Sequence, residues 1–159
     1  MIAPDAALPT WTIRRAGRDE APLLAALVER AYAAWVPVIG RRPAPMDDDY
    51  AARCAAGEAF VLTDPGGMAG LCVLEDRPDH LYLDNVALEP ARQGEGLGRA
   101  LLDFAEAEAR RRGYGEIRLL TNALMARNIA LYAARGYREW DRRREHGFSR
   151  VFMRKALAA

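Results

Sequence analysis

Three glycines at alternate positions form the part of this chain best suited to binding an anion. Residues 92–99 read Arg-Gln-Gly-Glu-Gly-Leu-Gly-Arg, and an alternating, strand-like stretch precedes them. Apolar side chains then recur at i, i+3, i+4, i+7 and i+8, which predicts a helix that begins beside the loop. Unpaired backbone N–H groups and the positive end of the helix dipole converge at such a beginning. We therefore expect the loop to bind a phosphate-bearing molecule.

The spacing of these glycines excludes two common phosphate-binding motifs. In the dinucleotide fingerprint Gly-x-Gly-x-x-Gly, the third glycine would fall on Arg99 or on Leu101. In the P-loop motif the second glycine would also fall on Arg99, and no Lys-Ser/Thr pair follows it. The remaining pattern, Gln93-x-x-Gly96-x-Gly98, has two interpretations. It is either a phosphate cradle or a loop whose glycines only make a tight turn between a strand and a helix.

Charge, hydropathy and cysteine content argue against several classes of protein. The 159 residues carry 23 basic and 22 acidic side chains, a balance that predicts binding to neither nucleic acid nor a membrane surface. No apolar run approaches ~18 residues and the N-terminal residues lack a targeting pattern, so we expect a cytoplasmic protein. Cys54, Cys72, His80 and His146 lack ligand spacing, and we expect neither a metal site nor a disulfide framework.

Hydrophobic periodicity predicts the element order β-α-α-β-β-β-α-β-α-β-β. Strands are expected at residues 10–16, 59–63, 68–75, 80–88, 116–121, 137–143 and 148–155. Helices are expected after an N-cap at Asp19, with Leu23 on the buried face, and at residues 47–56, 96–112 and 127–135. Because hairpins alternate with single crossovers, this order predicts an α/β (α+β) fold with a mixed, mostly antiparallel sheet of about seven strands and helices on both faces.

The element order and two motifs together resemble the GNAT superfamily of N-acetyltransferases. The first motif is Gln93-x-x-Gly96-x-Gly98, similar to the family's pyrophosphate-binding signature. The second, residues 128–137, reads Asn-Ile-Ala-Leu-Tyr-Ala-Ala-Arg-Gly-Tyr and is similar to the family's Leu-Tyr-x-x-x-Gly-Phe/Tyr helix and exit. The resemblance covers residues 10–157 and implies one N-acetyltransferase domain over residues 1–159, with the sheet splayed between its fourth and fifth strands.

The resemblance implies acetyl-CoA as co-substrate and no metal. Backbone groups of Val86, Ala87 and Leu88 would pair with the pantetheine arm as an added strand does. The pyrophosphate would bind backbone N–H groups along the loop, namely those of Gln93, Gly94, Glu95, Gly96, Leu97, Gly98 and Arg99. The side chain of Arg92 or Arg99 would add charge-assisted bonds. Members of the family often carry an asparagine about seven residues before the tyrosine; that position is Met125 here, and Asn128 is the candidate replacement.

The resemblance also implies that an amine attacks the thioester directly, with a backbone N–H near Val86 or Leu88 acting on the carbonyl oxygen. Tyr132 would be the general acid, because a phenol of pKa about 10 stays protonated at neutral pH and can donate to a departing thiolate. Asp84 is the first candidate for the base, expected on the same strand face as Val86. A rim carboxylate paired with an arginine, and a water relay without a side-chain base, are the alternatives.

The acceptor is expected between the first two helices and the last hairpin. Its predicted aromatic walls are Tyr32, Trp35, Tyr50 and Trp140. The acidic run at residues 47–49 either attracts a cationic amine or caps the following helix. A small-molecule amine or a peptide N-terminus fits this description, and homodimers are common in the family. A catalytically silent acyl-CoA sensor and a nucleotide-binding module are the rival functions.

Overall fold

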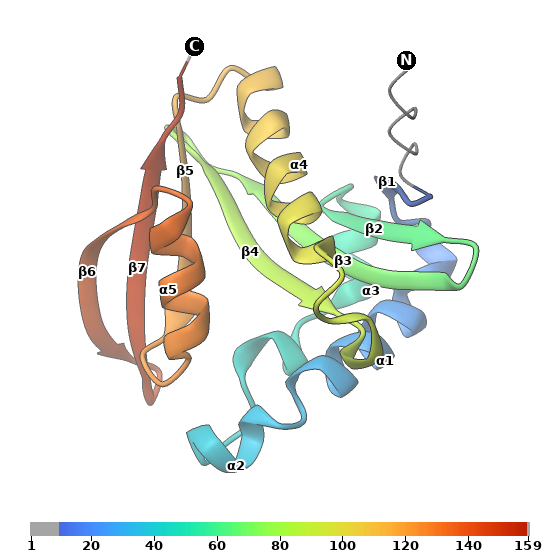
Figure 1. Ribbon diagram of the computed structural model, residues 1–159, viewed down its shortest axis with the longest axis horizontal. Helices are drawn as coiled ribbons and strands as arrows, with labels where there is room; N and C mark the ends of the chain where they lie inside the picture. The colour runs from blue at the N-terminus through green and yellow to red at the C-terminus, as the bar shows by residue number, and fades with distance from the viewer. Residues whose placement is uncertain (1–9, 159) are drawn as a thin grey trace, which may run out of the picture.

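The computed structural model describes residues 10–158; residues 1–9, in which we expect no targeting segment, lie outside the described part (Figure 1). The strands are β1 (Thr12–Arg15), β2 (Ala59–Asp64), β3 (Gly67–Asp76), β4 (Leu81–Leu88), β5 (Glu116–Asn122), β6 (Arg138–Glu145) and β7 (Phe148–Ala156). The α-helices are α1 (Ala21–Tyr32), α2 (Trp35–Ile39), α3 (Tyr50–Ala55), α4 (Leu97–Arg111) and α5 (Ala126–Ala134). Short 3-10 turns occupy η1 (Arg18–Glu20), η2 (Ala44–Asp47) and η3 (Pro90–Arg92).

The seven strands form one mixed sheet in the order β1-β2-β3-β4-β5-β7-β6. Every neighbouring pair is antiparallel except β4 and β5, which run parallel. The parallel pairing joins only residues 81–83 to residues 117–119, and beyond it the two strands diverge (Figure 1). The predicted fold class is therefore confirmed, including the splay between the fourth and fifth strands.

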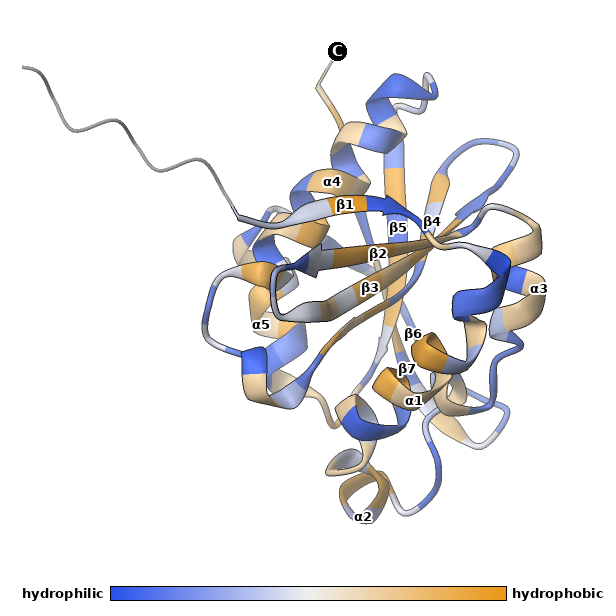
Figure 2. Ribbon diagram, turned by 90° about the vertical axis from the view of Figure 1, so that its right-hand side faces the viewer, coloured by the Kyte–Doolittle hydropathy of each residue, from blue (hydrophilic) through white to orange (hydrophobic). Residues whose placement is uncertain are grey.

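Each face of the sheet has its own apolar core. On one face, α4 packs over the central strands through Leu101, Leu102 and Ala105, and α5 lies on the same side. On the other face, α1 packs through Leu24 and Leu27, together with α3. Apolar residues colour the central strands in Figure 2, as expected for a sheet buried on both faces. Among residues 10–158, no helix has the length and apolar character needed to cross a bilayer.

The predicted boundaries hold to within a few residues except in the first two helices. Asp19 lies in the turn η1 instead of capping α1, because the chain enters the helix through that turn. Leu23 is 57% exposed, so the buried face of α1 is narrower than predicted. The second predicted helix begins at Tyr50 rather than at residue 47, because Asp49 caps it by accepting a hydrogen bond from the Ala52 N–H at 3.0 Å.

Candidate functional site

A β-bulge at Asp84 reverses the side-chain alternation of β4. Neighbouring residues of β3 pair with Leu83 and with Asn85, so Asp84 is the extra residue on β4. Leu83 lies in the core under α4 and Val86 packs against that same core, although an odd spacing would place them on opposite faces of a regular strand. Our prediction that Asp84 shares a face with Val86 is therefore wrong. The bulge turns Asp84 and Asn85 together toward α1 and α3.

Two cavities meet where β4 and β5 diverge. The first, of about 400 Å³, extends from β4 toward η2 and the start of β7. The second, of about 940 Å³, extends along the glycine loop and α5. The residues that line both cavities are Tyr32, Val86, Met125, Asn128 and Tyr132. Groups bound in the two cavities can therefore approach each other at this junction.

The second cavity contains most of the residues predicted to bind the cofactor. Its lining includes Val86, Ala87, Leu88, Gln93, Gly94, Gly96, Leu97, Gly98, Arg99 and Asn128. Glu95 is not in this lining, and its carboxylate accepts a hydrogen bond from Arg92 at 2.9 Å. Because pairing with β5 ends at Leu83, the later backbone of β4 faces the gap between the strands. An extended ligand arm fits there as an added strand.

The glycine loop leaves open space at the start of α4. Gly94 and Gly96 have φ values of +86° and +81°, a conformation that glycine adopts without steric cost. A Cβ added at either position would have no heavy atom within 4 Å. Gly96 is the N-cap of α4 and provides no side-chain cap, so the first N–H groups of the helix are available to an anion. The loop therefore fits a pyrophosphate.

Of the two arginines proposed to assist phosphate binding, only Arg99 lines the cavity. Arg92 is held between Asp64 of the β2–β3 hairpin and Glu95, and both carboxylates accept its hydrogen bonds. With its charge compensated on both sides, Arg92 anchors the loop to the hairpin. The charge-assisted contact is therefore assigned to Arg99 as a candidate.

Tyr132 lies at the junction of the cavities, on the same face of α5 as Asn128 four residues earlier. Its ring packs edge-on against Tyr137 with centroids 5.8 Å apart. Burial raises the pKa of Tyr132 to about 12, so its hydroxyl is protonated at neutral pH. Asn128 donates its Nδ2–H to the sulfur of Met125 at 3.7 Å, so the predicted replacement and the position it replaces are in contact.

Buried charges hold α5 against α4 and the sheet. Glu106 of α4 is 4% exposed and contacts Lys155 Nζ at 2.6 Å and Arg135 Nη2 at 3.1 Å. The Tyr137 hydroxyl donates to the same carboxylate at 3.2 Å. Because Arg135 and Tyr137 follow α5 directly, this network keeps Tyr132 in place.

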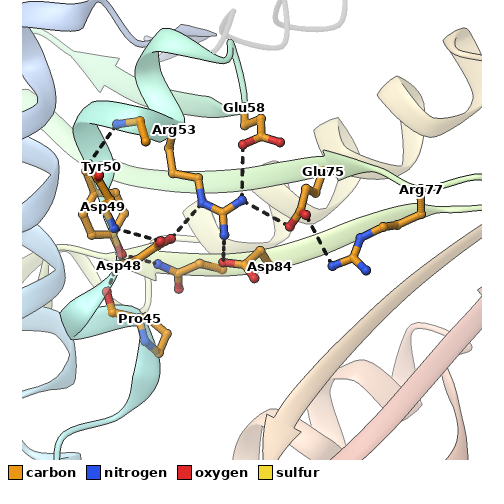
Figure 3. A network of polar contacts seen from close by, with 11 residues as sticks. Pro45, Asp48, Asp49, Tyr50, Arg53, Glu58, Glu75, Arg77 and Asp84 are labelled. Carbon is orange, nitrogen blue, oxygen red and sulfur yellow. Dashed lines mark hydrogen bonds and ion pairs between the residues drawn. The ribbon is translucent and has the colours of Figure 1, made fainter.

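Asp84 belongs to an acidic cluster around one guanidinium (Figure 3). Arg53 of α3 contacts four carboxylates, those of Asp48, Glu58, Glu75 and Asp84, at 2.9 to 3.3 Å. Burial raises the pKa of Asp84 to about 6; Arg53 opposes this shift, and the carboxylates of Asp48 and Glu75 add to it. A carboxyl group with a pKa near 6 is ionised at neutral pH and can accept a proton.

The residues predicted to form the acceptor site do not lie together in the structure. Tyr32 lines both cavities, whereas Trp35 lines only the one beside the glycine loop. Tyr50 is 4% exposed and lies beneath the site, and Trp140 packs against Phe152 on the outer strands. Neither Tyr50 nor Trp140 lines either of these two cavities, which corrects the prediction for both.

The three carboxylates of the acidic run at residues 47–49 also have different partners. Asp47 pairs with Arg42, Asp48 pairs with Arg53, and Asp49 caps α3. Of the three, Asp47 and Asp48 line the first cavity. The capping alternative is therefore confirmed for Asp49, and attraction of a cationic amine by Asp47 and Asp48 stays a prediction.

Sequence reasoning missed Arg53 and Asn85. Asn85 is 4% exposed, and a polar residue at a buried position of an apolar strand is a signal that a partner or a purpose exists. Arg53 gave no such signal, because a helix arginine is ordinarily a solvated one. Among residues 10–158, no group of three or more His, Cys, Asp or Glu side chains is arranged to hold a metal ion.

Comparison with known proteins adds two kinds of similarity. Over 87 residues, 55% of this chain and 59% of the relative, the chain is 38% identical to [Ribosomal protein bS18]-alanine N-acetyltransferase of Escherichia coli K12. The chain thus spans about 59% of the length of the curated relatives it matches. The crystal structure of the Escherichia coli ribosomal-protein-S18-alanine N-acetyltransferase superposes with a TM-score of 0.74 at 25% identity, covering 94% of this chain and 95% of that one.

Proteins of lower sequence identity share the same fold. PaiA N-acetyltransferase from Thermoplasma acidophilum, solved in complex with coenzyme A, superposes with a TM-score of 0.76 at 15% identity, over 94% of this chain and all of that one. At that identity the likeness concerns the fold. The family model described as Acetyltransferase (GNAT) family matches residues 24–137. The chain therefore belongs to the GNAT family of acetyltransferases.

Proposed function

We propose that this protein is an acetyl-CoA-dependent N-acetyltransferase, folded as one domain with its core at residues 10–157. It transfers an acetyl group to a primary amine by direct attack within a ternary complex. The observation that carries the proposal is the junction of two cavities at Tyr32, Val86 and Tyr132. Family membership supports acetyl-CoA as the donor. A ternary mechanism needs two binding spaces that meet at one point, because both substrates must be bound when they react.

The second cavity is proposed to hold the coenzyme. The N–H groups of residues 93–99 and the dipole of α4 bind the pyrophosphate, and Arg99 adds charge. Backbone groups of residues 86–88 bind the pantetheine arm along the gap between β4 and β5, and Asn128 contacts the same arm. Trp35 lines this cavity and is reassigned here from the acceptor side.

The chemistry at the junction is proposed to need one acid and one base. Acetyl-CoA supplies a thioester whose carbonyl carbon bonds to the amine nitrogen as its carbon–sulfur bond breaks. Tyr132 donates its hydroxyl proton to the departing sulfur. Asp84 takes the first proton of the ammonium group, directly or through one water molecule, which frees the lone pair that attacks. The nitrogen loses its second proton as the amide forms, and that proton restores the Tyr132 hydroxyl. A backbone N–H near Val86 or Leu88 donates a hydrogen bond to the carbonyl oxygen.

The first cavity is proposed to bind an amine that arrives as a cation. Asp48 and Asp84 line it, and the four carboxylates around Arg53 outnumber the nearby guanidinium groups. A peptide N-terminus and a small amine both fit, and the Escherichia coli relative, whose name gives an alanine of ribosomal protein bS18 as acceptor, favours a peptide. We also propose a cytoplasmic location and a homodimer through the edge of β6.

The test combines coenzyme binding with turnover. Coenzyme A, ATP and NAD at equal concentrations are compared by thermal shift, and a ligand at 100 times its dissociation constant stabilises by about 2.7 kcal/mol. Thiol release from acetyl-CoA is then followed with hexapeptides that carry an N-terminal alanine, with diamines and with free amino acids. Stabilisation by coenzyme A alone, with amine-dependent thiol release, supports the proposal. Coenzyme A binding without turnover on any amine indicates a silent acyl-CoA sensor instead.

A further inference from the structure

A chain of hydrogen bonds runs beneath the bulge of β4 and ends at the cavity junction. Tyr32 Oη of α1 lies 2.6 Å from Asn85 Oδ1, and Asn85 Nδ2 lies 3.2 Å from Tyr50 Oη of α3. The Tyr50 hydroxyl in turn lies 2.6 Å from the carbonyl oxygen of Pro45 in η2. Asn85 and Tyr50 are each 4% exposed. Four residues from four different elements are thus joined by three short contacts.

The carbonyl group of Pro45, at the end of this series of hydrogen bonds, determines which group donates in each of them. A backbone carbonyl can only accept, so the Tyr50 hydroxyl donates to Pro45. The oxygen of Tyr50 therefore accepts its other bond, and only the NH₂ group of Asn85 can supply it. The carboxamide oxygen of Asn85 then faces Tyr32, whose hydroxyl must donate to it. The orientation of the Asn85 amide follows from this chain of partners.

The Tyr32 hydroxyl is left as a hydrogen-bond acceptor. Its single proton is committed to Asn85, and the oxygen keeps lone pairs available. Tyr32 lines both cavities and lies at their junction with Val86 and Tyr132. An attacking amine must direct its own lone pair at the carbonyl carbon, so its N–H bonds point away and need acceptors. The Tyr32 oxygen is suited to accept one of them.

We propose that Asn85 is a positioning residue that sets the polarity of the Tyr32 hydroxyl, so that Tyr32 accepts a hydrogen bond from the attacking amine. The inference rests on the proposed function. Without the Asn85 oxygen, the Tyr32 hydroxyl is free to donate toward the cavity, because the alternative acceptor, the Val86 carbonyl, lies 3.5 Å away. A hydroxyl that donates competes for the amine lone pair that has to attack.

The test uses Asn85→Leu, Tyr32→Phe and the double variant, with an N-terminal-alanine hexapeptide and 1,4-diaminobutane as amines. We expect each single variant to lower kcat/KM for the amine about 10-fold, the size of one lost hydrogen bond, with the KM of acetyl-CoA unchanged. The double variant should be no slower than either single one, because Asn85 acts through Tyr32. Asn85→Asp, whose carboxylate still accepts from Tyr32, should recover part of the loss.

Tyr50→Phe is the second variant, in case Asn85→Leu does not fold. Tyr50 lines neither cavity, yet its hydroxyl orients the amide of Asn85, so we expect a 3- to 10-fold loss in the same constant. Losses that multiply in the double variant, unchanged amine kinetics, or a raised KM for acetyl-CoA would each overturn the positioning role. Absence of thiol release from the unsubstituted protein with both amines would instead overturn the proposed function, and this inference with it.

Discussion

Replacing Asp84 by asparagine tests whether the Asp84 carboxylate has a catalytic role or a structural one. Its pKa near 6, against an ordinary value of 3.8, means that ionisation is less favourable in the folded protein by about 3 kcal/mol. This free-energy difference already includes the attraction between Asp84 and Arg53, whose charged atoms lie 3.3 Å apart. The Arg53 pair therefore does not compensate for the burial of Asp84. A carboxylate that costs stability and lines a cavity is typical of a functional position.

The expected stability change depends on pH in a definite direction. Above about pH 6, Asp84 is ionised in both states, so the folded protein bears the whole cost. Between about pH 6 and 3.8 the folded protein takes up the proton while the unfolded chain stays ionised, and stability rises as the pH falls. Asp84→Asn removes this dependence. We expect the variant to be more stable by up to about 3 kcal/mol at pH 8, with the difference closing by about pH 4.

Urea unfolding at pH 8, 6 and 4 measures this difference, and thiol release measures activity. The variant should lose about 100-fold or more in kcat. The unsubstituted protein should show a limb in kcat near pH 6 that is absent from Asp84→Asn. Two amines of different pKa distinguish this limb from the amine's own titration, which moves with the amine. A variant less stable than the unsubstituted protein at pH 8 would contradict the reasoning and assign Asp84 to the Arg53 ion pair.

Three further substitutions test the other parts of the site. Tyr132→Phe should retain the thermal shift with coenzyme A and lower kcat by about 10²–10⁴-fold, measured by thiol release. Gly96→Ala should lose about 1 kcal/mol of stability, because φ is +81°, and should bind coenzyme A more weakly by calorimetry. Glu106→Gln should lower the free energy of unfolding in urea by about 3 kcal/mol, because it leaves Lys155 and Arg135 without their buried carboxylate.

Matched variants provide the controls for these substitutions. Gly113→Ala, at the other end of α4 with φ of +87°, has the same strain and should leave coenzyme A binding intact. Asp103→Asn removes an exposed partner of Arg135 and should cost less than about 1 kcal/mol. Equal effects on coenzyme A binding at both ends of α4 would argue against the loop as the pyrophosphate site. Full turnover by Tyr132→Phe would remove that hydroxyl from the mechanism.

The helices, the strands and the glycine loop could be predicted from local sequence patterns. The period of apolar residues located most strands of the sheet, the turn at Gly147 located the last hairpin, and glycine spacing located the start of α4. The predictions failed where packing between elements overrode the periodicity of a single helix or strand. Leu23 has the right spacing for the buried face, yet the core beneath α1 is too narrow to cover it. Asp84 alternates correctly with Val86 in the sequence, and the bulge then places it on the other face.

The sequence alone determined the family, the element order and the glycine loop, because these depend on residue type and spacing along the chain. Only the tertiary structure decided which residues meet at the junction. It paired Arg92 with Asp64, placed Trp35 in the cavity beside the glycine loop, and surrounded Arg53 with four carboxylates. It also joined Tyr32, Asn85 and Tyr50, which are up to 53 residues apart. Such contacts depend on strand register and on one inserted residue, and no periodicity in the sequence encodes either.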